Sequence, residues 1–405
     1  MTLQLDIFPS LFVATAVLLL GRGLIACIAP LRTYNIPEPV VGGLVAAFAV
    51  TVLRAMGIEV SFNTALQTPL MLMFFCTVGL AANIKMVLSG GRMLLRFLLI
   101  VAAFLVVQNV LGIGVALALD VNPLLGLLGG SITMSGGHGT GTAWADVFAR
   151  QYQLSGALEV AMACATFGLV LGGLIGGPVA HYLIDRLPAA KRDATAGEQG
   201  AEPDNAFEKP EKLLLITTKL LVEKLFLLAG AMSIGFVLEK LTSGTAWSLP
   251  TFVWVMFSGV LVGNVVAHTP FYDMEERALS VIGNTCLSLF LAMALMSLKL
   301  WQLIDLALPI LAMLIVQTIA MALWAVFVTY RFMGRNYEAV VLAAGHCGFG
   351  LGATPTAIAN MQTVTNRFGP AHLAFILVPV VGAFFIDLAN SVVLKGFLSL
   401  PLFAH

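Results

Sequence analysis

The chain has 405 residues, of which 59% are hydrophobic and only 10% are charged. A water-soluble domain carries about 25% charged residues, so this composition excludes a water-soluble globule and indicates that lipid covers much of the surface. The 21 basic and 21 acidic residues cancel, which leaves no basic face for nucleic acid. The five cysteines lie in apolar stretches without CxxC spacing, so neither a disulfide framework nor a zinc site is predicted.

Hydrophobic segments long enough to cross a bilayer recur along the chain. A hydrocarbon core of ~30 Å needs about 20 apolar residues per helix. Such segments lie at about 8–29, 39–57, 69–88, 94–118, 157–184, 213–238, 249–267, 278–298, 303–330 and 370–396. We therefore predict an all-α polytopic membrane protein with about ten transmembrane helices.

Two glycine-rich segments, at about 122–150 and 336–365, interrupt this series. Each is partly apolar and is broken near its centre by glycines, hydroxyl side chains and a histidine. A continuous helix facing lipid would leave the freed backbone groups without partners in hydrocarbon. We predict that each segment is a re-entrant hairpin buried in protein; two extra full spans, or two surface loops, are the alternatives.

A polar stretch divides the chain into an N-terminal repeat (1–185), a linker (186–212) and a C-terminal repeat (213–405). The linker is rich in Ala, Glu, Gly, Pro and Lys, as solvated connections are. Each half has four spans, a hairpin and one span, and Gln108 in VAAFLVVQNVLG matches Gln317 in ILAMLIVQTIAM. An odd number of spans per half turns the second half upside down, and such inverted repeats are typical of secondary transporters.

The lysines and arginines predict the orientation of the chain. Most of them fall in the loops on the linker's side of the membrane. Because positively charged loops remain in the cytoplasm, we expect a cytoplasmic linker and both termini outside. The first hairpin then enters the membrane from outside and the second from the cytoplasm.

The hairpin tips are the predicted site for an anionic substrate. Helix N-termini carry partial positive charge and exposed N–H groups, which hold a carboxylate without a buried arginine, and no lysine or arginine lies near the centre of either glycine-rich segment. Hydroxyls and an amide add polar contacts, unless they merely bond their own helix backbone. These substrate-binding candidates are Ser135, Thr140, Thr354, Thr356 and Asn360.

Ionisable residues inside spans are functional by default. Asp387 lies in the middle of the tenth span with Asn390 one turn later, and Glu159 lies early in the fifth span. Oxygen ligands suit a hard cation, so these three residues and Ser131 are the predicted sodium ligands. The alternative is a set of buried structural polar groups. Gln108, with Asn109 and Gln317, is expected to hold helices together.

Other chemistries are not indicated. His138 and His346 lie in the two tips, but no Cys/His/Asp set has ligand spacing, so no transition metal and no cofactor is expected. The string GFGLGA at Gly348 lacks the strand and βαβ unit of a dinucleotide loop. GGHG has no accompanying GxSxG elbow, so we do not expect an enzyme.

Long motifs carry a resemblance to a known family. The strings IPEPVVGGL, SGGHGTGTAW, EVAMACATFGLVLGGLIGGPVA, AAGHCGFGLGATPTAIANM and GAFFIDLAN closely resemble those of the bacterial sodium/glutamate symporter family. The resemblance covers essentially the whole chain. The loop residues that match the family's motifs are Gly136, Gly137, His138, Gly139, Gly350, Gly352, Thr354 and Pro355.

The resemblance implies inverted five-span halves with opposed re-entrant loops, a homodimer, and import of glutamate with sodium. It also implies alternating access, in which a transport domain moves past a fixed scaffold. A sodium-coupled carrier of another small carboxylate, such as citrate or malate, is the first alternative. An ion channel and a membrane-embedded enzyme are further alternatives of other classes.

Overall fold

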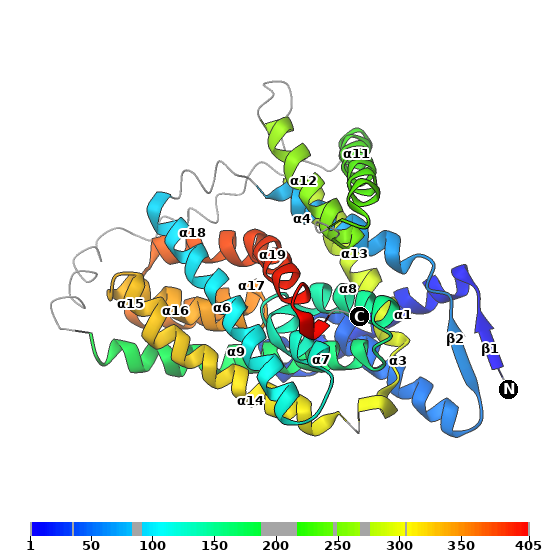
Figure 1. Cartoon of the computed structure of the whole chain (residues 1–405), viewed down its shortest axis with the longest axis horizontal. Helices are drawn as coiled ribbons and strands as arrows, with labels where there is room; N and C mark the ends of the chain where they lie inside the picture. Colours follow the sequence, from blue (N-terminus) through cyan, green and yellow to red (C-terminus); the bar gives the residue numbers. More distant parts are fainter. Residues whose placement is uncertain are drawn as a thin grey trace.

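A computed structural model of the chain describes residues 2–34, 36–82, 91–187, 217–245, 249–267, 276–303 and 306–403. The described chain is almost entirely helical (Figure 1). Before the linker the helices are α1 (Ile7–Cys27), α2 (Ala29–Thr33), α3 (Glu38–Ala55), α4 (Gln67–Ala81), α6 (Gly91–Ala118), α7 (Pro123–Leu127), the π-helix η1 (Leu128–Ile132), α8 (Gly137–Gln151) and α9 (Ala157–Ile184).

Further helices follow the linker. They are α11 (Thr218–Thr242), α12 (Thr251–Ala267), α13 (Glu276–Met296), η3 (Leu300–Leu303), α14 (Ala307–Trp324), η4 (Ala325–Thr329), α15 (Tyr330–Phe332), α16 (Tyr337–Gly350), α17 (Thr354–Phe368), α18 (His372–Val380), η5 (Val381–Phe385), α19 (Ile386–Leu398) and η6 (Pro401–Phe403).

Seven helices in the described part of the chain are long and apolar enough to cross a membrane. They are α1, α3, α6, α9, α11, α13 and the continuous run Ala307–Phe332. The tenth predicted span is a helix pair, His372–Ala383 and Ile386–Leu398, bent by 47°, which gives eight candidate spans if the pair crosses once. The prediction of a polytopic helical membrane protein is confirmed.

The other two predicted spans fall on shorter helices. The span at 69–88 coincides with α4, which has 15 residues, and the span at 249–267 coincides with α12, which has 17. Residues 83–88 of the former lie outside the described residues. Both helices are apolar, and they pack against each other.

One small sheet accompanies the helices: β1 (Thr2–Leu5) and β2 (Glu59–Phe62) pair in parallel, with Thr2 opposite Glu59. The sheet lies at the right edge of Figure 1, beside α1 and α3. Gly57 reverses the chain after α3 at φ +81°, a conformation that favours glycine. Residues 59–62 then alternate between exposed and partly exposed, which is the period of a strand.

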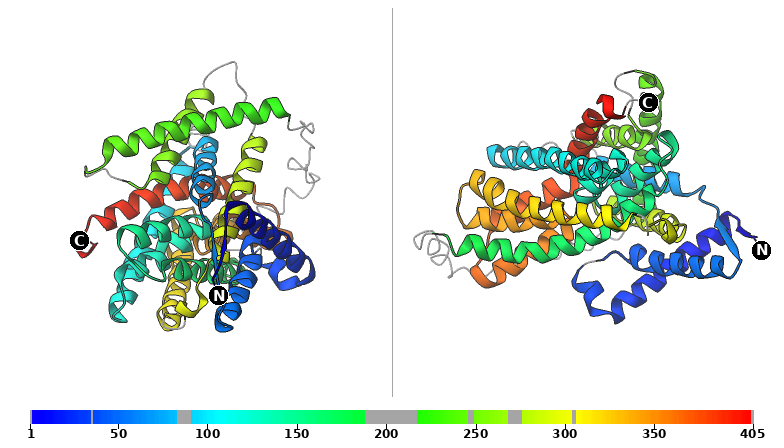
Figure 2. Two further views of the ribbon diagram at one scale, coloured as in Figure 1. Left: turned by 90° about the vertical axis from the view of Figure 1, so that its right-hand side faces the viewer. Right: turned by 60° about the horizontal axis from the view of Figure 1, so that its bottom comes forward.

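The helices form two groups by their packing contacts. The flanking group contains α1, α3, α4, α11, α12 and α13, and the hairpin group contains α6, α8, α9, α14, α16, α17 and α19. In the right-hand view of Figure 2, α1 and α3 lie beside the bundle of the hairpin group rather than within it. Contacts of α8 with α13, and of α12 with α19, join the two groups.

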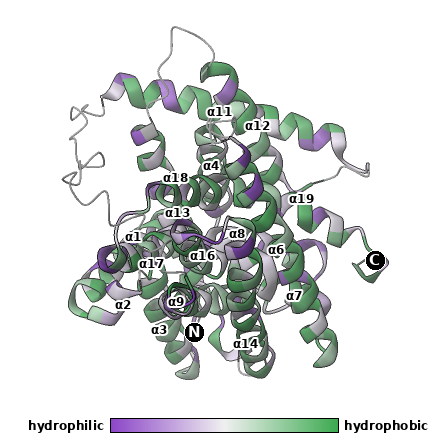
Figure 3. Cartoon of the chain, turned by 90° about the vertical axis from the view of Figure 1, so that its left-hand side faces the viewer, coloured by the Kyte–Doolittle hydropathy of each residue, from purple (hydrophilic) through white to green (hydrophobic). Residues whose placement is uncertain are grey.

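Hydrophobic residues make up most of the helices, as the green colour of Figure 3 shows. Phe8 and Phe12 on α1 are 82% and 74% exposed, and Phe226 on α11 is 77% exposed. Large apolar surfaces of this kind mark contact with a membrane or with another protein. Together with the candidate spans, these side chains indicate that lipid surrounds the flanking group.

Candidate functional site

Each glycine-rich segment consists of short helices with a break between them. Residues 133–136 separate η1 from α8, and residues 351–353 separate α16 from α17. Gly137 begins α8 at φ +69°, and Pro355 stands in the first turn of α17, where its fixed φ suits a helix start. Neither α8 nor α17 has a side-chain cap, so N–H groups at both N-termini are free to bind a ligand.

The two breaks, called the tips here, meet although they come from opposite halves of the chain. A Cβ atom at Gly137 would lie 3.4 Å from the carbonyl oxygen of Gly352. The Ser135 hydroxyl lies 3.2 Å from the carbonyl oxygen of Gly350. The fold therefore brings the N-termini of α8 and α17 to one place.

A cavity of about 640 Å³, called the tip cavity here, lies at this meeting point. Both tips, α4, α13 and the start of α19 line it, so the hairpin group and the flanking group each provide a wall. Its volume is within the range of small-molecule sites, about 300–1,000 Å³. Glu38 and Asp387 line it, and no lysine or arginine is among the described lining residues.

Most of the residues that the sequence predicted for the substrate line the tip cavity. They are Ser135, Gly136, Gly137, His138, Gly139, Thr140, Gly352, Thr354 and Pro355. Asp387, predicted to bind sodium, lines the same cavity. The structure thus brings together residues that stand more than 200 positions apart in the sequence.

Three other predicted substrate residues do not line the tip cavity. A Cβ atom at Gly350 would lie 2.7 Å from Sδ of Met321, so Gly350 faces α14. The Asn360 amide donates to the carbonyl oxygens of Gly172 (2.9 Å) and Ala344 (3.3 Å) and thereby joins α17 to α9 and α16. Thr356 is buried, and its hydroxyl has no partner among the described residues.

Asp387 and Thr140 connect α19 to α8 at the cavity wall. The Thr140 hydroxyl donates to Oδ1 of Asp387 at 2.7 Å. A carboxylate oxygen and a hydroxyl oxygen therefore lie side by side where the cavity reaches them, and both are ligand types that a hard cation accepts.

Two further predicted sodium ligands, Ser131 and Asn390, contact each other. Ser131 also contacts Asn109. The Ser131 hydroxyl is 2.6 Å from Oδ1 of Asn390 and 2.9 Å from Oδ1 of Asn109. All three side chains are fully buried, and none is among the residues lining the tip cavity. This polar cluster joins η1, α6 and α19.

Glu159, the remaining predicted ligand, lies elsewhere. Its carboxylate accepts the backbone N–H of Lys299 at 2.9 Å, which joins the first turn of α9 to the chain after α13. It is not among the residues lining the tip cavity.

Gln108, which the sequence analysis assigned to contacts between helices, also bonds residues at both tips. The side chain accepts from the Ser135 hydroxyl at 2.6 Å and donates to the Gly350 carbonyl at 2.8 Å. One buried amide on α6 therefore holds both tips. Gln317 donates to the backbone oxygen of Gln108 at 2.7 Å and does not bond either tip. In the sequence, only the match of Gln108 with Gln317 between the halves had pointed to this residue.

The two tip histidines bond hydroxyl groups. Nε2 of His138 is 3.1 Å from the Thr166 hydroxyl, and Nδ1 of His346 is 2.8 Å from the Thr329 hydroxyl. The His346 ring also stacks on Phe349, with ring centroids 5.0 Å apart. His138 lines the tip cavity, whereas His346 does not.

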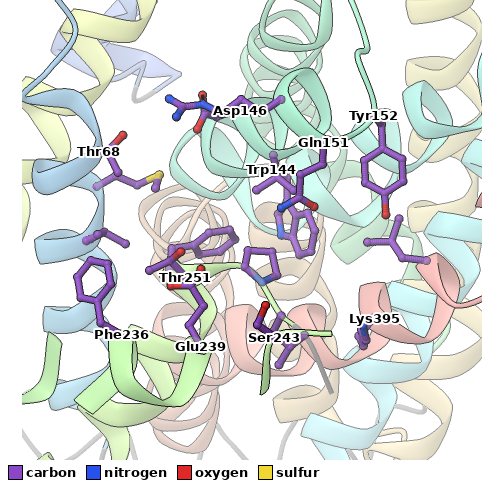
Figure 4. A pocket seen from close by; sticks show the side chains of 18 residues that line it. Thr68, Trp144, Asp146, Gln151, Tyr152, Phe236, Glu239, Ser243, Thr251 and Lys395 are labelled. Carbon is purple, nitrogen blue, oxygen red and sulfur yellow. Dashed lines mark hydrogen bonds and ion pairs between the residues drawn. The ribbon is translucent and has the colours of Figure 1, made fainter. Parts of the chain in front are cut away.

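A second cavity of about 440 Å³ lies along the same helices (Figure 4). Residues of α4, α8 and α19 line both cavities, but at different heights: α8 contributes Thr140 to the tip cavity and Arg150 to the second one. Asp146, Gln151, Glu239 and other polar groups line the second cavity, as Figure 4 shows. Polar and apolar side chains line it in similar measure, and it lies toward the C-terminal end of α8.

Aromatic rings stand between the two cavities. Trp144 on α8 packs edge-on against Phe252 on α12, with ring centroids 5.6 Å apart, and Phe252 packs against Phe75 on α4 at 4.8 Å. All three rings are buried. This aromatic contact joins the hairpin group to the flanking group and closes the second cavity toward the tips.

Comparison with known proteins places the chain in a family. A model of the sodium/glutamate symporter family matches residues 3–370. The chain is 56% identical over 402 residues to a protein of Escherichia coli (strain K12) named sodium/glutamate symporter, covering 99% of both. A protein of the same name from Haemophilus influenzae is 49% identical over 404 residues, covering 98% of both. These are transporters and not enzymes. The chain belongs to the sodium/glutamate symporter family.

Proposed function

We propose that this protein carries glutamate together with sodium across the inner membrane of a bacterium and that both bind at the tip cavity. The relatives from E. coli and H. influenzae are named sodium/glutamate symporters. The observation that carries the proposal is the meeting of two uncapped helix N-termini, from opposite halves of the chain, in one cavity that also contains Asp387.

Helix N-termini hold the substrate's carboxylates in this proposal. The free N–H groups at the starts of α8 and α17, with the partial positive charge of each helix, favour a negative group. The hydroxyls of Ser135, Thr140 and Thr354 line the same cavity and provide further hydrogen bonds. Since no lysine or arginine is among the described lining residues, the anion depends on backbone dipoles.

Asp387 is the sodium ligand at the cavity, with the Thr140 hydroxyl beside it. A bound sodium ion neutralises the Asp387 carboxylate, which otherwise repels an anionic substrate in the same cavity. The two solutes therefore favour each other's binding, which is the basis of coupling. Glu159 is left out of this proposal because its carboxylate is bonded to Lys299 away from the cavity.

The proposed topology has ten spans, in two inverted repeats of five spans with one re-entrant hairpin each. In it α4, α12 and the bent pair α18–α19 each cross once. The excess of lysine and arginine on the linker's side supports a cytoplasmic linker and periplasmic termini. The homodimer remains a proposal based on the family resemblance.

Transport then follows from movement of the hairpin group along the flanking group. In the proposed topology the tip cavity reaches the cytoplasmic ends of α4 and α13, at Ala81 and Leu279. The second cavity lies at the periplasmic end of α4, at Thr68. Separation of Trp144 from Phe252 would allow the tips to move toward the second cavity. Rigid-body movement of one helix bundle against another is the usual form of alternating access in such transporters.

Uptake of labelled glutamate into proteoliposomes tests this function. We expect accumulation with an inward sodium gradient and none when choline replaces sodium. Unlabelled citrate, malate and aspartate serve as competitors. Failure of the folded protein to take up glutamate, with uptake of citrate or malate instead, would contradict the glutamate assignment. Current through single proteins without any gradient coupling would contradict the symport assignment.

A further inference from the structure

Three side-chain oxygens converge behind the wall of the tip cavity. The hydroxyl of Ser131 lies 2.9 Å from Oδ1 of Asn109 and 2.6 Å from Oδ1 of Asn390. The three residues come from η1, α6 and α19 and are 0% exposed. This oxygen cluster is separate from Asp387, which lines the cavity.

Backbone groups fix the orientation of both amides. The N–H of Ser131 donates to Oδ1 of Asn109 at 3.0 Å, so rotating that amide would place two donors against each other. Nδ2 of Asn390 donates to the carbonyl oxygen of Ser131 at 3.1 Å. Both amide oxygens are therefore held toward the Ser131 hydroxyl.

This arrangement has fewer hydrogen-bond donors than its amide oxygens need. A serine hydroxyl has one hydrogen to donate, but two amide oxygens lie within bonding distance of it. One oxygen–oxygen pair is then left without a hydrogen between them. In addition, Nδ2 of Asn109 has no partner among the described residues. Purely structural polar clusters in buried positions are normally fully bonded.

A cation resolves the arrangement, because it attracts all three oxygens at once. Amide, hydroxyl and carboxylate oxygens are the ligands of hard cations, and sodium sites in transporters form at broken helices. The helix breaks beside this cluster: Gly130, adjacent to Ser131, has non-helical φ −94° and ψ −135°.

We propose that Asn109, Ser131 and Asn390 form a second sodium site, distinct from the site at Asp387. This inference rests on the proposed sodium-coupled function and deepens it, since each transport cycle would then carry at least two sodium ions. The second site has no charged ligand. Asp387 and Asn390 are three residues apart on α19 and so lie on one face of that helix, which provides a path from the cavity to the buried site.

Sodium-dependent thermal stabilisation of the full-length protein in lipid nanodiscs tests this proposal without glutamate. Sodium chloride replaces choline chloride at constant ionic strength, and intrinsic tryptophan fluorescence reports Tm. A ligand that binds only the folded state raises Tm as its concentration exceeds its Kd. The Asp387→Asn variant removes the charged site, so any remaining sodium response must come from another site.

The comparison uses two further substitutions in the Asp387→Asn background. Ser131→Ala removes the central oxygen. Thr133→Val is the matched control, because the Thr133 hydroxyl is equally buried in the same segment. It donates instead to the backbone carbonyl oxygen of Leu128 at 2.6 Å. If Ser131→Ala does not give a monodisperse protein, Ser131→Cys keeps a donor of similar size and replaces the hard oxygen with sulfur.

We expect sodium to raise the Tm of Asp387→Asn and of Asp387→Asn with Thr133→Val, and to leave the Tm unchanged once Ser131 is replaced. Absence of a sodium response in Asp387→Asn, or a response that survives replacement of Ser131, would overturn the second site. Neither result depends on glutamate, so failure of the proposed function would be seen separately, in the uptake assay of the wild-type protein.

Discussion

Asp387 lines the tip cavity and accepts a hydrogen bond from Thr140 on α8. Replacing it with Asn keeps the size of the side chain and removes the charge. We expect the half-saturating sodium concentration for glutamate uptake to rise about tenfold or more, which corresponds to ~1.4 kcal/mol of lost binding free energy. The measurement is uptake into proteoliposomes over a sodium titration.

Asp120→Asn is the matched control for this substitution. Asp120 is exposed after α6 and has φ 54°, a conformation that asparagine also adopts readily. The sodium dependence of uptake by Asp120→Asn should equal that of the wild type. An Asp387→Asn protein with unchanged sodium affinity would show that Asp387 is not a sodium ligand.

Gln108 holds both tips through one buried amide. Gln108→Leu should raise the KM for glutamate several-fold, because the tips lose the hydrogen bonds that set their separation. Gln317→Leu is the comparison, since Gln317 lies equally buried but bonds only the Gln108 backbone. Initial uptake rates over a glutamate titration at saturating sodium give both KM values. Equal changes of KM in the two variants would show that Gln108 only holds helices together and does not set the positions of the tips.

At the scale of residues, the sequence predicted types of group better than their positions. Tip hydroxyls were predicted from their chemistry and tip glycines from the family resemblance, and most of them line the cavity. Asn360 was included for its amide and Gly350 for its motif, yet both face neighbouring helices. Side-chain direction in a broken helix depends on packing from the other half of the chain, which local sequence does not contain.

The close packing of α16 against α17 gives a testable prediction for these two helices. A Cβ atom at Gly348 would lie 2.4 Å from Cα of Ala357, which is backbone and cannot move aside. Gly348→Ala should therefore separate the two helices, destabilise the protein by about 1–3 kcal/mol and abolish uptake. The measurement is Tm in detergent together with uptake in proteoliposomes.

Gly114→Ala is the matched control, because a Cβ atom at that position of α6 meets nothing within 4 Å. Alanine has a higher helix propensity than glycine by roughly 1 kcal/mol, so the Tm of this variant should be equal to that of the wild type or higher. If Gly348→Ala behaves like Gly114→Ala, the close packing of the second hairpin is wrong.

Element types followed from hydrophobic length and from glycine. Both glycine-rich segments contain the predicted break near their centre, since glycine and proline act locally. The sheet of β1 and β2 was missed because its strands have four residues each and stand more than 50 positions apart. Short, distant pairings of this kind leave too little local signal to separate them from a loop.

The contact of Trp144 with Phe252 gives a testable prediction for the whole molecule. In the proposed mechanism these rings must separate in every transport cycle. We expect the double variant Trp144→Cys and Phe252→Cys to stop transporting when a short, reducible bifunctional thiol reagent joins α8 to α12, and to recover on reduction. Each single variant with the same reagent is the control. Normal uptake by the cross-linked protein would contradict movement between the two groups.

At this scale the sequence predicted two similar halves but not the cavity between them. The matching of Gln108 with Gln317 indicated that the halves correspond. The meeting of Gly137 with Gly352, and the walls that α4 and α13 add, depend on how the halves pack. The ten spans, their orientation and the homodimer stay predictions.

The central claim is that glutamate binds between the N-termini of α8 and α17, beside a sodium ion at Asp387. A cryo-electron microscopy map of the protein with sodium and glutamate tests it most directly. We predict density for a substrate carboxylate within hydrogen-bond distance of the backbone N–H groups at Gly137 and Thr354. Glutamate density in the second cavity near Arg150, with the tips empty, would contradict the account.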